Sequence, residues 1–205
     1  MTVLREPFAD HSSETAHSLY GKLCVHLKEI MQLQGIEGLL QWDQEAMMPP
    51  KAAAARANQS SALAGAIHQK KIAPALGALL SELEHRHTLT DLSADLNPYE
   101  LANIRLALKQ WKEATVLTSE VVQAAAGLTA RATGAWAQAR KESNFSKFAP
   151  LLEEHIQLAR HIAALKIRGG VCETARQINE KARASLNLQP GDECFKGYYQ
   201  VLLDT

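Results

Sequence analysis

The eight histidines are the residues of this sequence best suited to chemistry, because imidazoles can bind a metal ion. Two ligands on one helix face stand three or four residues apart. No two of the histidines have that spacing, and the sequence contains no H-E-x-x-H motif. We therefore predict no metal-binding residue in the chain, and we single out no catalytic or cofactor-binding residue. The histidines are His11, His17, His26, His68, His85, His87, His155 and His161.

Two Glu-x-x-His pairs leave a minor alternative open. They are Glu14 with His17 and Glu82 with His85. Such pairs hold di-iron sites in helical bundles when two further inward-pointing glutamates join them. Here both pairs fall near the ends of predicted helices in polar surroundings, which favours ordinary solvated side chains. His155 lies on an apolar helix face, where a lone histidine is expected to be a hydrogen-bonded core residue.

The segment from Leu40 to Pro50 gathers a tryptophan, two acids and an amide at a predicted helix end. One interpretation is a buried Trp42, with Asp43 and Gln44 hydrogen-bonded to neighbouring helices. The other is a wall of a substrate cleft. The pattern of residues alone favours the first interpretation.

Charge and composition exclude several classes of function. Lys+Arg and Asp+Glu are equal at 22 each, so we expect neither nucleic-acid nor membrane-surface binding. No apolar run is long enough to span a membrane, and the N-terminus has no secretory pattern. G-x-S-x-G and nucleotide-phosphate motifs are absent. Cys24, Cys172 and Cys194 form no C-x-x-C pair, which predicts reduced thiols in a cytoplasmic protein.

The elements that must position these side chains are predicted to be helices. Only 5% of residues are aromatic, Ala and Leu are abundant, and no period-2 run occurs. Six main helices are expected, with Ser12 or Ser13 capping the first and Thr118 or Ser119 capping the fifth. The fifth carries a narrow stripe of small residues that would let a neighbouring helix approach closely. The predicted ranges are 12–48, 51–70, 74–87, 97–111, 118–139 and 144–168, with a shorter polar helix at 173–186.

Several blocks of the sequence, in order, resemble the N-terminal part of Taq-type zinc metallocarboxypeptidases. Trp42-Asp43-Gln44 followed by Met48-Pro49 is the first, and the resemblance runs from about Leu19 to Asp204. The stretch 168–196 is longer and more polar than the family pattern and is interpreted as an insertion. The later blocks are Asn103 to Arg105 with Trp111 to Thr115, Trp136 to Arg140 leading to Asn144 to Leu152, and Tyr198 to Asp204.

The resemblance implies an all-α, multi-helix array: the N-terminal helical part of a larger zincin-like peptidase, with residues 1–205 as one cleft-wall or lid region. Family members are cytoplasmic homodimers that remove single residues from peptide C-termini. Their zinc is held by an H-E-x-x-H motif and a later glutamate, all downstream of the matched region. We assign structural roles to the positions that match the family framework, which are Trp42, Asp43, Arg105, Trp136, Arg140 and Phe148.

Two functions of different classes follow. The first is a non-catalytic N-terminal fragment of a metallocarboxypeptidase, which would meet a peptide substrate only together with the missing catalytic region. The chain stops at Thr205 inside a matched block, which favours this interpretation. The second is a stand-alone helical interaction module.

Metal analysis of the purified chain tests the di-metal alternative. Because no two histidines share a helix face, we predict less than stoichiometric zinc, iron or manganese after dialysis, unchanged by Glu14→Ala or Glu82→Ala. One or more equivalents of metal that either substitution removed would establish the bundle site.

Overall fold

The chain folds as an array of helices. The computed structural model describes residues 14–89, 92 and 95–171, and all regular elements within these ranges are helical, which confirms the predicted all-α class. The predicted helix at 173–186 and the block at Tyr198 to Asp204 lie outside the described residues. The elements are α1 (Ala16–Ala46), the 3-10 turn η2 (Pro50–Ala52), α2 (Ala53–Lys71), α3 (Pro74–Leu89), α4 (Pro98–Thr115), α5 (Ser119–Lys141), the 3-10 turn η4 (Phe145–Lys147) and α6 (Ala149–Arg168).

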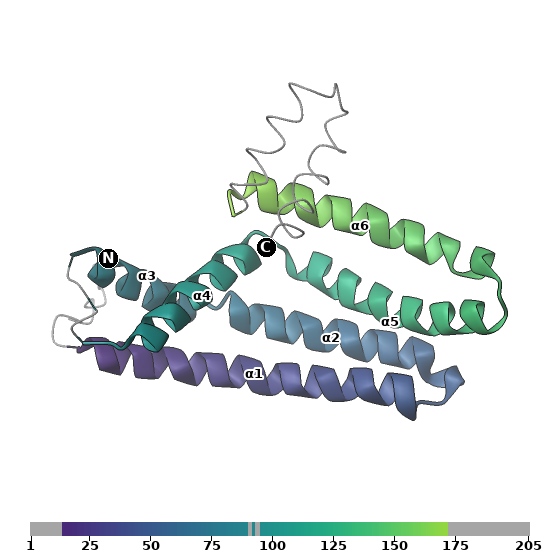
Figure 1. Cartoon of the computed structure of the whole chain (residues 1–205), viewed down its shortest axis with the longest axis horizontal. Coiled ribbons are helices and arrows are strands. Elements are labelled where there is room, and N and C mark those ends of the chain that lie inside the picture. The colour runs from purple at the N-terminus through teal and green to yellow at the C-terminus, as the bar shows by residue number, and fades with distance from the viewer. Residues whose placement is uncertain (1–13, 90–91, 93–94, 172–205) are drawn as a thin grey trace, which may run out of the picture.

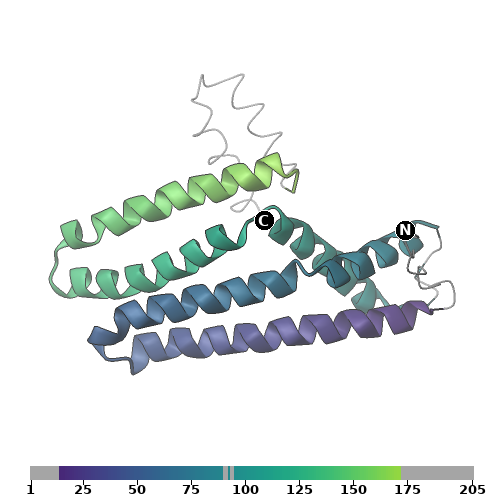
Figure 2. The same cartoon turned by 180° about the vertical axis from the view of Figure 1, so that it is seen from behind.

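Four long helices lie side by side in the spatial order α1, α2, α5, α6, as both views show (Figure 1, Figure 2). The shorter α3 and α4 gather at one end of this layer, beside the beginning of α1. The array therefore exposes long helix faces on both sides. None of the described helices has a segment long and apolar enough to cross a bilayer.

Polar caps set where the helices begin. Thr15, not Ser12 or Ser13, caps α1, and its side chain accepts a hydrogen bond from the Ser18 amide. Asn97 caps α4 in a capping box, and Thr118 caps α5. Each cap satisfies an amide that has no partner within its helix.

Prolines and glycines set other boundaries. Pro50 opens a 3-10 turn, so α2 begins at Ala53, two residues later than predicted. Pro150 lies in the first turn of α6, as predicted, where its missing N–H costs no hydrogen bond. Gly169 ends α6, and Gly170 follows with a φ of 69°, a left-handed conformation that glycine adopts without strain.

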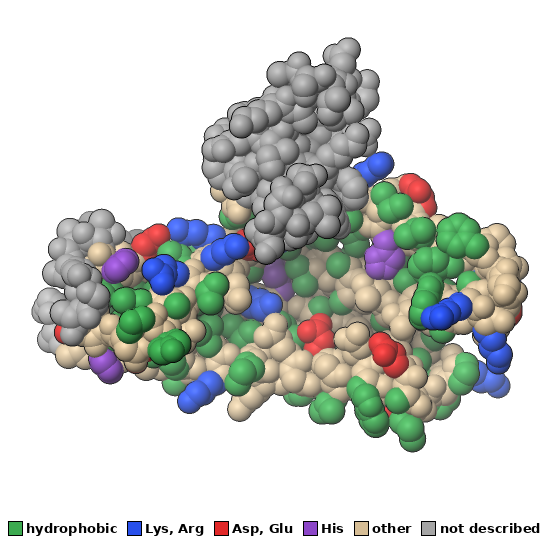
Figure 3. Space-filling model, in the orientation of Figure 1, with side chains coloured by type: hydrophobic (Ala, Val, Ile, Leu, Met, Phe, Trp, Pro, Cys, Tyr) green, Lys and Arg blue, Asp and Glu red, His purple; other side chains and the backbone are tan. Residues whose placement is uncertain are grey.

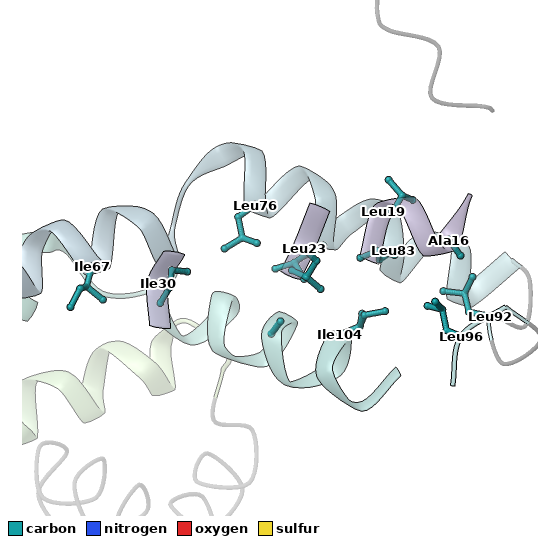
Figure 4. Packing of buried hydrophobic residues seen from close by; sticks show 12 residues of the cluster. Ala16, Leu19, Leu23, Ile30, Ile67, Leu76, Leu83, Leu92, Leu96 and Ile104 are labelled. Atoms are coloured by element: carbon teal, nitrogen blue, oxygen red, sulfur yellow. The ribbon is translucent and has the colours of Figure 1, made fainter. Parts of the chain in front are cut away.

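The large apolar side chains pack at the end of the layer where α1, α3 and α4 meet. Leu23, Leu80 and Leu83 are fully buried there. Figure 4 shows side chains from these helices, and Leu92 and Leu96 from the segment before α4, pointing toward one another. Leu19, Leu23 and Ile30 of the predicted α1 stripe belong to this cluster, and Leu27 packs against it. The leucine-rich core thus anchors α3 and α4 to the N-terminal half of α1.

The contact between α2 and α5 is made by small residues. A Cβ added at Gly127 would lie 3.6 Å from the carbonyl oxygen of Ala57. The side chain of Gln123 occupies the space that a Cβ on Gly65 would need. Helix axes approach closely only where side chains are this small. Gly127 and Gln123 lie on a different face of α5 from the predicted stripe of small residues, which includes Ala125, Leu128 and Ala132, so these contacts do not place that stripe against α2.

Gly35 and Gly38 of α1 do not mark a close contact with another described helix. A Cβ added at either would meet nothing within 4 Å in the described structure. Both residues lie on exposed parts of α1.

Replacing one of two leucines on α1 tests where the core lies. Leu23 is 0% exposed and Leu39 is 65% exposed. Because Leu23→Ala leaves a cavity, we predict a loss of about 2–5 kcal/mol in the free energy of unfolding. The matched Leu39→Ala should cost less than about 0.5 kcal/mol. Equal losses in urea denaturation would contradict the assignment.

Candidate functional site

Arg56 fastens the end of α1 to the beginning of α2. Its Nη2 donates to Asp43 Oδ2 at 2.5 Å, its Nη1 donates to the carbonyl of Leu40, and its Nε donates to Gln59 Oε1 at 3.0 Å. The Arg56 side chain is only 11% exposed. A planar guanidinium can make these three bonds at once, whereas a lysine could not. Asp43 therefore has the structural role predicted for it.

Gln44 ties α1 to α5. Its Nε2 donates to the carbonyl oxygen of Ala130 at 2.7 Å. Hydrogen bonds from Asp43 and Gln44 to neighbouring helices are thus confirmed. The accompanying prediction of a buried Trp42 is wrong, because that side chain is 61% exposed.

Neither Glu-x-x-His pair brings its two side chains to a common partner. Glu14 pairs with Lys22 at 2.6 Å, and Glu82 pairs with Arg86 at 2.6 Å. The histidines of both pairs are exposed. Within the described residues, no three His, Cys, Asp or Glu side chains come close enough to hold a metal ion. The described part of the chain therefore offers no set of side chains that fits the zinc which the family resemblance implies for longer proteins.

Among the described histidines, His68 is the buried one, at 3% exposure. Its Nε2 lies 3.1 Å from the carbonyl oxygen of Ala114, and its Nδ1 lies 3.1 Å from Ser119 Oγ. A carbonyl oxygen only accepts, so Nε2 carries a hydrogen; in the neutral ring Nδ1 then accepts from the Ser119 hydroxyl. His68 thereby joins α2 to the end of α4 and the start of α5.

Sequence reasoning did not single out His68. Its two partners lie 46 and 51 residues away along the chain. No local pattern could have indicated them, because the contact exists only once α2 has packed against α5.

The start of α5 also perturbs an acid. The backbone amide of Glu120 hydrogen-bonds that residue's own carboxylate, and this lowers its pKa below the ordinary value. The Thr118 hydroxyl lowers the pKa further. Glu120 is fully exposed, so the perturbation reflects its place at the helix N-terminus.

His155 is not the hydrogen-bonded core residue that was predicted. It is half-buried, and neither ring nitrogen hydrogen-bonds another described residue. It borders a hollow of about 360 Å³ between α5 and α6, together with Trp136 and Phe148. The Arg140 guanidinium lies 5.3 Å from the centre of the Trp136 ring, a cation–π contact.

A second hollow, of about 310 Å³, opens where α1, α2, α4, α5 and α6 converge. Acidic, basic and imidazole groups lie around the hollowed front face in Figure 3. Lys166 of α6 pairs with Glu113 of α4 at 3.3 Å at its edge. Glu37 and Lys71 line it without an ion pair to any described residue. It can therefore accept groups of either charge.

Arg105, the remaining family-matched position, is exposed on α4. It lines a separate hollow of about 440 Å³ with Lys109 and Lys112, beside the end of α6. Two helix C-termini border this hollow, and their partial negative charge opposes anion binding there.

Substitution at His68 tests the buried hydrogen bonds. His68→Leu keeps an apolar side chain but leaves the Ala114 carbonyl and the Ser119 hydroxyl without their partner, so we predict a loss of about 1–3 kcal/mol in stability. Ser119→Ala should lower the free energy of unfolding less in the His68→Leu variant than it does in the wild-type chain. Exposed His161→Leu is the control. Strict additivity of His68→Leu and Ser119→Ala would contradict the bond.

The sequence and fold match known proteins. Residues 22–172 match the family described as carboxypeptidase Taq (M32) metallopeptidase. Thermostable carboxypeptidase 1 from Thermus thermophilus is 26% identical over 192 residues, which make up 93% of this chain and 33% of that protein.

Solved structures agree with this match. The M32 carboxypeptidase from Deinococcus radiodurans R1 is 28% identical, with a TM-score of 0.54 over 82% of this chain and 35% of that one. Trypanosoma cruzi metallocarboxypeptidase 1 shares the fold at 24% identity and a TM-score of 0.55, over 83% of this chain and 36% of that one. The chain thus spans about a third of the length of these proteins. From the match over residues 22–172, the chain belongs to the carboxypeptidase Taq (M32) metallopeptidase family.

Proposed function

We propose that this chain is the N-terminal helical framework of a metallocarboxypeptidase that releases single amino acids from peptide C-termini. In this proposal the chain is not catalytic by itself, and the zinc ligands come from polypeptide outside it. The observation that carries the proposal is the family match over residues 22–172, in a chain that has no H-E-x-x-H motif. A zinc peptidase needs three protein ligands that converge on the metal.

The helical ties support a framework role. Arg56 and Gln44 bind the end of α1 to α2 and α5, and His68 binds α2 to the α4–α5 junction. These bonds hold long helices in fixed positions, which is what the wall of a cleft requires. The proposal also includes, from the family resemblance, a cytoplasmic location and a homodimer in the full-length form.

A stand-alone helical interaction module is the second candidate. It is favoured by the three fully buried leucines, because the chain has a core of its own. Size-exclusion chromatography separates the candidates. A monomer with cooperative unfolding favours the module, whereas association through exposed apolar faces favours the framework.

Amino-acid release tests the framework proposal directly. The 205-residue chain, loaded with zinc and freed of contaminating protease, should release no C-terminal residue above background. Sequencing the transcript beyond codon 205 should reveal an open frame that encodes H-E-x-x-H, and its product should release C-terminal residues until 1,10-phenanthroline removes the metal. Chelator-sensitive release by the short chain alone, or a stop codon at that point, would contradict the proposal.

A further inference from the structure

Three hollows follow one another along α5, with neighbouring hollows sharing lining residues, and we call this series the trough. The 310 Å³ hollow at the helix junction shares Glu37 with a hollow of about 220 Å³ beside the second half of α1. The latter shares Thr129 and Thr133 with the 360 Å³ hollow at Trp136. Figure 3 shows this hollowed face running between α1 below and α5 and α6 above.

The trough has the length of a short extended peptide. Val122 lines its first hollow and Trp136 its last, about four turns apart on α5 or roughly 21 Å. An extended chain advances about 3.3 Å per residue, so about six residues span it. We propose that the trough binds an extended peptide segment, with one lysine or arginine side chain at its middle and an aromatic or aliphatic side chain at the Trp136 end.

The middle hollow supplies acceptors for a cation. Glu37 and Glu45 line it with Gln41 and Gln44, and no lysine, arginine or histidine borders it. Neither glutamate forms an ion pair with another described residue. Carboxylates and amide oxygens are good acceptors for an ammonium or guanidinium group.

The two ends of the trough limit what can bind. At one end Trp136 is 47% exposed, and Phe148 and buried Ala132 border the same hollow, so an apolar or aromatic side chain can lie against it. At the other end Lys71 and Lys166 line the hollow together with Glu37 and Glu113, so that end does not select for one sign of charge. The middle hollow is therefore the part of the trough that favours a basic side chain.

The inference rests on the proposed function, since it names the peptides that a carboxypeptidase framework would favour. Titration calorimetry of the 205-residue chain tests it with hexapeptides acetylated at one end and amidated at the other. Each carries a lysine and a phenylalanine three residues apart, in either order. Such peptides have no free carboxyl terminus, so their binding is independent of any C-terminal hydrolysis.

We expect one of the two lysine peptides to bind below about 1 mM, and replacement of its lysine by norleucine to weaken binding about tenfold. Glu37→Gln combined with Glu45→Gln should abolish the difference in affinity between the two peptides without changing the affinity for the norleucine peptide. Trp136→Ala should weaken both peptides about fivefold. Glu29→Gln is the matched control on α1, because Glu29 pairs with Lys70 outside the trough. This substitution should leave the affinity for both peptides unchanged.

No binding by any peptide at 1 mM would overturn the inference. Equal binding of the lysine and norleucine peptides, or an effect of Glu29→Gln as large as that of the double variant, would also overturn it. If the longer zinc-containing product released C-terminal residues while these blocked peptides failed to bind, the trough alone would be refuted and the proposed function would stand.

Discussion

The close contact between α2 and α5 is the constraint on which the rest of the array depends. Gly127 lies against the Ala57 backbone, and Gln123 fills the space beside Gly65. These contacts bury little apolar surface per residue, so their contribution comes from close packing rather than from large side chains. With α2 and α5 held together, α1 can pack on one side of the pair and α6 on the other (Figure 1).

The hydrogen bonds of Gln44 and His68 follow from that contact, because each joins helices that meet only after α2 and α5 have packed. Gln44 of α1 donates to the Ala130 carbonyl of α5, beside the first half of α2. His68, near the C-terminal end of α2, hydrogen-bonds residues at the α4–α5 junction. Such buried or half-buried hydrogen bonds add modest stability but leave few alternative arrangements. The trough lies along the same helix pair, so its shape depends on the same packing.

Much of the fold could be predicted from the sequence because its signals are local. Asn97-Pro98, Thr118 and Gly169-Gly170 mark helix boundaries through their own caps and dihedral angles. The site was harder to predict. The hydrogen bonds of Asp43 and Gln44 to neighbouring helices were expected, but the exposure of Trp42, the buried role of His68 and the place of His155 beside Trp136 depend on which helices lie nearby. The predicted insertion at 168–196 stays a prediction, since most of it lies outside the described residues.

Backbone amide hydrogen exchange, followed by NMR, tests the central role of the α2–α5 contact most directly. We expect the amides next to Ala57, Gly65 and Gly127, in α2 and α5, to exchange only through global unfolding. Their exchange free energies should then equal the free energy of unfolding of the whole chain. Exchange of these amides as fast as those at the exposed C-terminal end of α1, under conditions where the leucine-rich core stays protected, would contradict the account.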